Sequence, residues 1–161
     1  MTRTTRRLAA AAIAAVFVAG CASLPSPVTV TDTAARTAQL STLSRLIGEA
    51  GLADTLRGPG PFTLFAPSDE AFKAVPAKTL AELGSDKELL KSVLAFHVVP
   101  GKLSAADVKN GNAKTVNGDN VALAKAGDIV TVEDAVVTQP DVAASNGVVH
   151  VIDRVLLPPK R

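Results

Sequence analysis

The sequence contains no tryptophan and no tyrosine, and its aromatic residues are five phenylalanines among 161 positions. Proteins that bind single-stranded nucleic acid stack bases on aromatic side chains and neutralise phosphates with basic ones. The formal net charge of +2 is small, and it depends on three arginines near the N-terminus, Arg3, Arg6 and Arg7. Nucleic acid is therefore not an expected partner of this chain.

Cysteine and histidine are also scarce. The single cysteine, Cys21, excludes a disulfide within the chain, and His97 and His150 are the two histidines. A closed metal site needs about four ligands in which nitrogen and sulfur predominate, and these residues do not recur at short spacing. We therefore expect no metal and no cofactor, and we expect a hydrophobic core to hold a chain of this length together.

The longest apolar run lies at the N-terminus and is too short to cross a membrane. Leu8 to Val18 follows the three arginines, whereas a spanning helix needs roughly 20 apolar residues. The pattern is typical of a signal peptide, here residues 1–20, and Val18-Ala-Gly-Cys21 resembles the bacterial lipobox, whose cysteine is lipidated and becomes the new N-terminus. The alternatives are an ordinary signal peptide with an incidental thiol, and twin-arginine export through Arg6-Arg7.

Processing before Cys21 changes the charge and sets the expected boundaries. It removes three of the 17 basic residues and none of the 15 acidic ones, which leaves 14 against 15, a formal charge of −1. We predict the lipidated cysteine and a flexible tether over residues 21–37, and one domain over residues 38–159. The expected location is the bacterial cell envelope, after export across the plasma membrane, with the lipid anchor at the outer membrane, in the periplasm or on the outer cell surface.

Helical periodicity dominates the first half of the domain. Apolar residues recur at helical spacing from Leu40 to Ala50, and Gly51 stands where a C-cap glycine belongs. Ser85-Asp-Lys-Glu88 resembles a capping box that opens another helix ending near Phe96. These patterns predict a helical first half.

Between these helices, the stretch from Phe62 to Phe65 predicts a strand. Phe62 and Leu64 face one side and Thr63 and Phe65 the other, so apolar groups on both faces favour a central position in a sheet.

A helix is expected directly after this strand. Pro67 lacks the N–H that would continue the ladder, and Ser68 is placed to cap a helix whose first turn carries Asp69 and Glu70. Phe72, one turn later, is expected to return to the core.

The second half of the domain changes to a period of two. Turn residues separate four strand candidates: Thr115-Val116, Val121 to Leu123, Ile129 to Val132 and Ala135 to Thr138. A helical first half and a strand-rich second half predict an α+β domain.

A second strongly apolar strand, Asn146-Gly-Val-Val-His-Val-Ile-Asp153, lies near the C-terminus. Together with Thr63 to Phe72 and Phe96-His-Val-Val-Pro-Gly101, it resembles the signature segments of the fasciclin (FAS1) domain family, in the family's order, over about Ala38 to Pro159. The resemblance implies a β-sheet core, a sandwich or wedge of short strands, covered by several short helices. It also implies a structural role for the motif residues Phe65, Ser68, Asp69, Phe72, Phe96, His97, Asn146, Gly147, His150 and Asp153.

Residues with catalytic potential have simpler structural explanations. His97 and His150 stand in apolar surroundings, where each ring is expected to hydrogen-bond inside the fold. Ser68 lacks the setting of a nucleophile elbow, and the adjacent Asp69 and Glu70 point in different directions on a helix. We therefore predict that the protein is not an enzyme.

The resemblance implies an adhesive function, because FAS1 domains are commonly extracellular or cell-surface modules. Animal members carry a Tyr-His pair and an Asp-Ile dipeptide implicated in receptor binding; here Phe96-His97 lacks the hydroxyl, and Asp141-Val142 keeps the acid beside a β-branched residue. Because Pro140 and Asn146-Gly147 indicate a loop, we expect the interaction loop to comprise Gln139, Pro140, Asp141 and Val142.

These features favour a lipid-anchored envelope protein that mediates adhesion, or attachment in a matrix or biofilm, through a protein or polysaccharide partner. One alternative is a module that binds a small apolar ligand between the helices and the sheet, which requires a cavity of roughly 300 Å³. Another is a hydrolase, which requires a serine within hydrogen-bond reach of a histidine.

Overall fold

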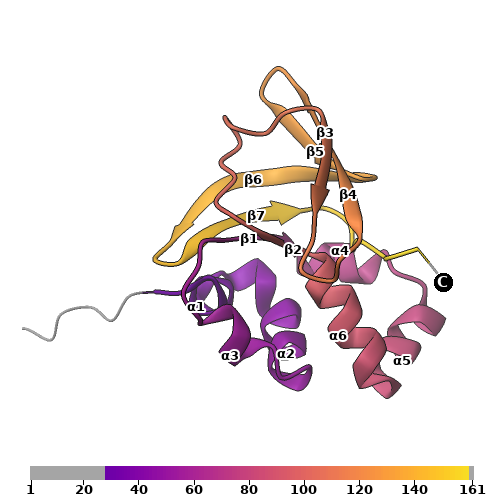
Figure 1. Cartoon of the computed structure of the whole chain (residues 1–161). Coiled ribbons are helices and arrows are strands. Elements are labelled where there is room, and N and C mark those ends of the chain that lie inside the picture. Colours follow the sequence, from indigo (N-terminus) through magenta and orange to yellow (C-terminus); the bar gives the residue numbers. More distant parts are fainter. Residues whose placement is uncertain (1–27, 160–161) are drawn as a thin grey trace, which may run out of the picture.

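The computed structural model describes residues 28–159 and confirms an α+β architecture (Figure 1). The predicted signal peptide and Cys21 lie outside the described residues. The helical elements are α1 (Val30–Arg36), the 3-10 turn η1 (Ala38–Leu40), α2 (Ser41–Glu49), α3 (Ala53–Leu56), α4 (Asp69–Lys73), α5 (Ala77–Ser85) and α6 (Lys87–Phe96). The strands are β1 (Phe62–Pro67), β2 (Val98–Pro100), β3 (Gly111–Lys114), β4 (Asn120–Ala126), β5 (Ile129–Val132), β6 (Ala135–Ala144) and β7 (Gly147–Ile152).

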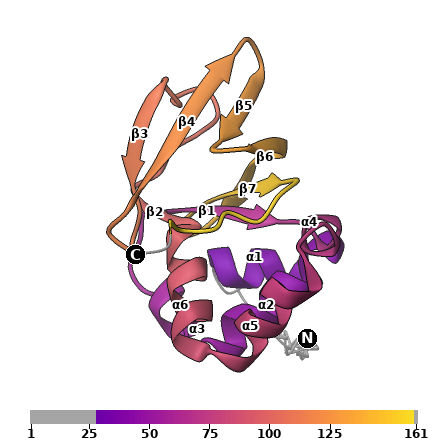
Figure 2. The same cartoon turned by 90° about the vertical axis from the view of Figure 1, so that its right-hand side faces the viewer.

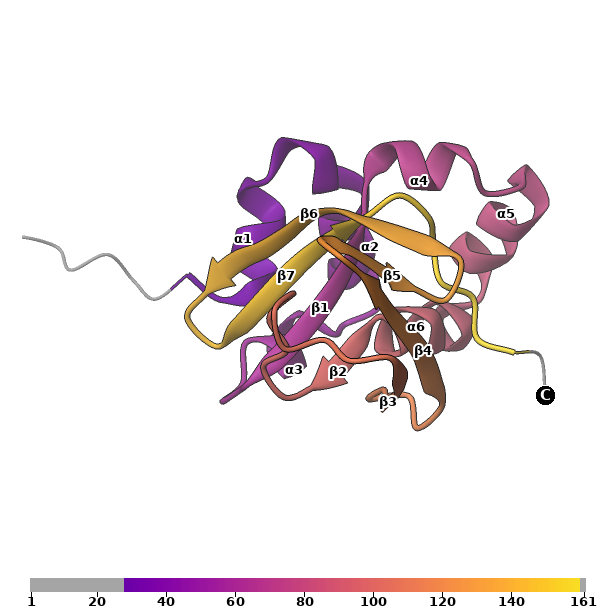
Figure 3. The same ribbon diagram turned by 90° about the horizontal axis from the view of Figure 1, so that it is seen from above.

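One seven-stranded sheet runs in the order β2-β1-β7-β6-β5-β4-β3 (Figure 3). β1 pairs with β2 on one side and β7 on the other, which confirms it as a central strand. The β1–β7 pair is parallel, and the other pairs are antiparallel. The sheet is nearly closed, because Val116, just after β3, donates its N–H to the Val98 carbonyl in β2 at 2.8 Å.

β1, β2 and β7 lie between the helices and the remaining strands (Figure 2). A hydrophobic core lies on each side of these central strands. Leu64 and Phe72 belong to the core between the helices and β1, β2 and β7. Phe65 and Phe96 belong to a second core, which residues of β3, β4, β5 and β6 enclose. β1 therefore has a buried apolar side chain on each face, as its sequence predicts.

The tether prediction is wrong for residues 30–36, which form α1. Thr29 caps this helix: its hydroxyl accepts from the Asp32 N–H, and the Asp32 carboxylate accepts from the Thr29 N–H. Val30 and Ala34 are fully buried against the domain. Two apolar residues at helical spacing and a capping box thus make α1 part of the fold.

Two local predictions also differ from the structure. α5 continues through Ser85, and Asp86 is the N-cap of α6, accepting from the N–H groups of Glu88 and Leu89. The strand predicted at Thr115-Val116 is displaced, because β3 spans Gly111–Lys114. At the first place Asp86, next to Ser85, takes the capping role. At the second, the N–H and the hydroxyl of Thr115 both donate to the Asp119 carbonyl, so this residue belongs to a turn.

Within residues 28–159, the helices are too short and insufficiently apolar to cross a bilayer.

Candidate functional site

Asn146, in the turn between β6 and β7, joins three parts of the domain. Its side-chain Oδ1 accepts from the Val30 N–H at 2.9 Å, and its Nδ2 donates to the carbonyls of Leu56 (2.7 Å) and Gly58 (3.0 Å). Its own carbonyl accepts from the Phe62 N–H at 3.0 Å. The residue therefore holds α1, the end of α3 and the start of β1 together.

Gly147 follows at a point of close backbone approach. A Cβ atom at this position would lie 1.9 Å from the Phe62 carbonyl oxygen, far inside van der Waals contact. The start of β7 therefore requires glycine for steric reasons, independently of backbone dihedrals.

Ser68 and Asp69 are both helix caps. The Ser68 hydroxyl accepts from the Ala71 N–H in α4. Asp69 accepts from the Ser41 hydroxyl (2.7 Å) and the Thr42 N–H (2.9 Å) at the start of α2, a helix without a side-chain cap of its own. Burial raises the pKa of Asp69, but these hydrogen bonds outweigh that effect and hold the pKa below its ordinary value. The carboxylate thus fastens α4 to α2.

His97 is fully buried between α6 and the segment after β7. Leu156 donates its N–H to Nε2 at 2.9 Å, so Nδ1 carries the proton and donates to the Val93 carbonyl at 2.7 Å. Burial lowers the pKa of His97 to about 4, although the hydrogen bond to Val93 acts in the opposite direction. The neutral ring therefore links the end of α6 to the chain at Leu156.

His150, in β7, supports the strand beside it. Asp141 donates its N–H to Nδ1 at 3.2 Å, and Nε2 therefore carries the proton that it donates to the Leu103 carbonyl at 2.7 Å. The ring also stacks on Phe65, with centroids 5.6 Å apart. This histidine thus connects β1, β6 and the β2–β3 connection.

The predicted interaction loop, Gln139 to Val142, is a bulged part of β6, so the loop prediction is wrong. The register with β7 shifts between Val137 and Gln139 and again between Gln139 and Val142. Asp141 adopts a positive φ of 55°, a conformation that aspartate tolerates better than most residues. The bulge replaces ladder pairing with the hydrogen bond to His150.

The side chains of Gln139 to Val142 differ in their exposure to solvent. Gln139, Pro140 and Asp141 are exposed, whereas Val142 packs against the helical core. Gln139 accepts from the Gln39 side chain at 2.9 Å. Asp141 accepts from the Ala105 N–H at 2.8 Å, so its carboxylate braces the β2–β3 connection while remaining accessible.

Asp153 fixes the other end of the same strand pair. Its carboxylate accepts from the Val136 N–H at 2.7 Å, and its own N–H donates to the Val136 carbonyl at 3.1 Å. This side chain stabilises the pairing of β6 with the end of β7.

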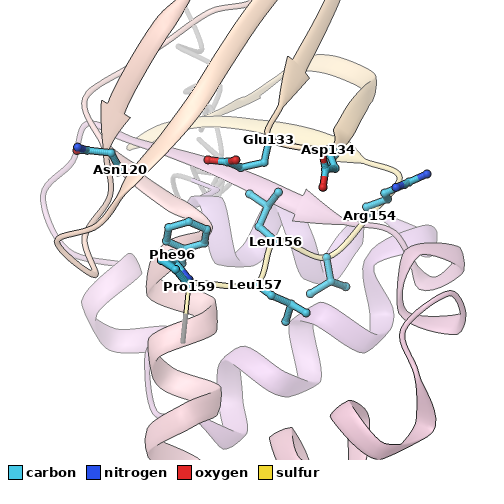
Figure 4. Close-up of a pocket in the computed structure, with 10 residues that line it drawn as sticks. Phe96, Asn120, Glu133, Asp134, Arg154, Leu156, Leu157 and Pro159 are labelled. Atoms are coloured by element: carbon cyan, nitrogen blue, oxygen red, sulfur yellow. The ribbon is translucent and has the colours of Figure 1, made fainter. Parts of the chain in front are cut away.

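The space between the helices and the central strands is filled by apolar side chains, and the grooves lie at the surface. One groove of about 470 Å³ is bordered by Glu133, Asp134 and Arg154 and floored by Phe96 and Leu156 (Figure 4). A second, of about 560 Å³, lies between α2, α4 and α5. The sequence does not predict either groove, because the walls of each come from segments far apart in the chain.

The histidines and Ser68 are not arranged as a catalytic group. Both nitrogens of each ring are engaged with backbone groups, and the Ser68 hydroxyl caps α4. In the part of the chain that the structure describes, no three His, Cys, Asp or Glu side chains are grouped so that they could hold a metal ion.

Comparison with known proteins gives consistent results. The Fasciclin domain family model matches residues 38–158. Protein sll1483 of Synechocystis sp. is 41% identical over 140 residues, which cover 86% of this chain and 78% of that protein. The cell surface glycolipoprotein MPB83 of Mycobacterium bovis is 36% identical over 147 residues, covering 88% of this chain and 64% of that protein.

A solved structure shares the fold. The FAS1 domain pair of the insect cell adhesion molecule fasciclin I superposes with a TM-score of 0.64 at 21% identity, over 81% of this chain and 51% of the other. The arrangement of helices and strands is therefore the FAS1 fold, and the chain belongs to the fasciclin domain family.

Proposed function

We propose that this protein is a lipid-anchored component of the cell envelope whose FAS1 domain binds a protein or polysaccharide of the envelope or matrix, in adhesion or biofilm-type attachment. The observation that carries the proposal is the similarity to a cell surface glycolipoprotein over 88% of the chain. The Val18-Ala-Gly-Cys21 motif is in keeping with it. The insect relative of the same fold is a cell adhesion molecule.

The side-chain geometry favours binding over catalysis. The motif residues with reactive groups are occupied as caps and as hydrogen-bond partners of the backbone. The alternative of a small apolar ligand between helices and sheet is less well supported, because apolar side chains occupy that space. The alternative of a hydrolase is also less well supported, because backbone groups engage both ring nitrogens of each histidine.

The anchor is tested by Cys21→Ala. Each buried CH₂ of an acyl chain contributes about 0.8 kcal/mol to membrane binding, and a processed chain with a formal charge near zero offers little electrostatic attraction. We expect the variant to leave the membrane fraction and the detergent phase, with wild type as the reference. A variant that remains in the detergent phase to the same extent as wild type would contradict the lipid anchor.

Partner binding is tested at Asp141 with two substitutions. Asp141→Asn keeps an acceptor for the Ala105 N–H and tolerates the positive φ, so its unfolding free energy is expected to stay within about 0.5 kcal/mol of wild type. Asp141→Ala loses the acceptor and is strained at this φ, which should cost roughly 1 to 2 kcal/mol. The measurement is retention of envelope extract on the immobilised lipid-free domain.

If the carboxylate contacts the partner, both variants retain less material than wild type. Loss confined to Asp141→Ala would show that the residue only braces the β2–β3 connection. Full retention by both variants would exclude Asp141 from the binding surface.

A further inference from the structure

The described chain begins at one pole of the domain. Ser145 donates its N–H to the Val28 carbonyl at 2.8 Å, and Val30 donates to the Asn146 side chain at 2.9 Å. The same turn contacts the segment before β1, because the Asn146 side chain donates hydrogen bonds to the carbonyls of Leu56 and Gly58. We call this the N-terminal pole and define it by residues 28–29, 58–61 and 144–147.

The opposite pole lies at the far ends of the central strands. β1 and β7 run parallel, from the pair Phe62 and Gly147 to the pair Pro67 and Ile152. Beyond Ile152 the chain meets the start of β6 through the hydrogen bonds of Asp153 and Val136. The C-terminal pole is defined by residues 133–134 and 153–154; Figures 1 and 3 show it at the other side of the molecule from the β6–β7 turn.

The length of the chain between Cys21 and the domain limits the orientations that the domain can adopt on a membrane. Seven residue steps separate Cys21 from Val28, and seven residues span at most about 25 Å in any conformation. A domain of about 130 residues has a radius of gyration of about 14 Å, which corresponds to a diameter of about 36 Å. The reach is therefore shorter than the domain, so the tether excludes the inverted orientation, in which the C-terminal pole faces the lipid and the N-terminal pole points away from it.

We propose that the N-terminal pole is a membrane-facing surface, held against the phospholipid headgroups, and that the C-terminal pole faces away from the bilayer. This inference rests on the proposed lipid anchor at Cys21 and deepens it by assigning a lipid-facing surface to the domain.

The two poles have surfaces suited to these positions. At the N-terminal pole, a groove of about 350 Å³ is lined by exposed Pro59, Pro61, Lys102 and Ser145. Lys102 brings a cation to the height of the anionic phosphates. The groove of Figure 4, bordered by Glu133, Asp134 and Arg154, lies at the C-terminal pole. It is consequently the groove presented to macromolecules beyond the membrane.

Thiol labelling can measure this orientation, because Cys21 is the single cysteine and lipidation consumes its thiol. Ser145→Cys and Asp134→Cys, both at exposed positions, each supply one free thiol at opposite sides of the domain and leave Lys102 in place. The lipidated full-length variants are labelled with a fluorophore and reconstituted in vesicles whose headgroups carry a nitroxide quencher. We expect the label at 145 to lose most of its emission and the label at 134 to retain it.

A longer tether provides the control. An insertion of about 20 Gly/Ser residues after Pro27 extends the maximum reach beyond the diameter of the domain, so the difference between the two labels is expected to shrink. Equal quenching of the two labels with the native tether, or stronger quenching at 134, overturns the orientation alone. Failure of the native chain to associate with vesicles overturns the lipid anchor, and the orientation with it.

Discussion

Gly147→Ala is expected to destabilise the domain by roughly 3 kcal/mol or more, because the new Cβ would lie 1.9 Å from the backbone oxygen of Phe62. Neither atom belongs to a flexible side chain, so β1 and β7 must move apart at the pair where they meet. That movement also disturbs the hydrogen bond from Phe62 to Asn146. Since small domains have a total stability of about 5–15 kcal/mol, chemical denaturation of purified protein will register the change readily.

Gly48→Ala is the matched control. Gly48 lies within α2, and a Cβ there would meet no heavy atom within 4 Å apart from the backbone of its own helix and its chain neighbours. Because alanine is a better helix former than glycine, this substitution is expected to stabilise the protein by about 0.5–1 kcal/mol. The same chemical change should therefore have opposite signs at the two positions. A Gly147→Ala variant as stable as wild type would refute the close approach of β1 and β7.

His97→Gln is expected to lower the unfolding free energy by roughly 2–4 kcal/mol at pH 7. The ring accepts from Leu156 and donates to Val93 in a fully buried site, and glutamine cannot satisfy both groups in the same geometry. A buried polar group without a partner costs about 1–3 kcal/mol.

The cost of this substitution should depend on pH. Burial lowers the pKa of His97 from 6.5 to about 4 in the folded protein, so between these values the unfolded state binds the proton and the folded state does not. The stabilisation from the neutral ring is therefore complete above about pH 6.5 and declines as the pH falls toward 4. At pH 5, wild type should have lost about 2 kcal/mol through this residue, and His97→Gln none.

Urea denaturation of both proteins at pH 7 and pH 5 measures the effect. The stability difference between wild type and variant should shrink by about 2 kcal/mol on acidification. Asp69 and Asp32 also have lowered pKa values, but their carboxyls titrate below the ordinary value of 3.8, outside this pH window. A difference that is the same at both pH values would mean that His97 is not buried in its neutral form.

Local chemistry explains what the sequence could predict. The strand at Phe62 and the helix capped by Ser68 follow from side-chain alternation and from one N-cap, both of which act over a few residues. The α+β class follows from the change of period along the chain. These features need no knowledge of which distant segments meet.

The structural features that the sequence does not predict depend on hydrogen-bond partners far along the chain, or on neighbouring sequence patterns that indicate a different structure. The Thr29–Asp32 capping box can be recognised in the sequence, but the prolines and serines just before it indicate a flexible tether. The bulge at Asp141 requires His150 and Ala105 as hydrogen-bond partners, nine and 36 positions away. Pro140 and the nearby Asn-Gly pair predict a loop there, because nothing local reveals those partners.

The parallel pairing of β1 with β7 also governs when the domain can fold. Phe62 and Gly147, paired in the sheet, are 85 positions apart, so closing this loop imposes a large entropic cost before its contacts form. Such non-local pairings slow folding. Until β7 is available, β1 has three residues of pairing with β2 and an open edge along its other side. A chain interrupted before Gly147 therefore exposes an apolar strand edge that can pair with other chains, so aggregation competes with folding until the last strand arrives.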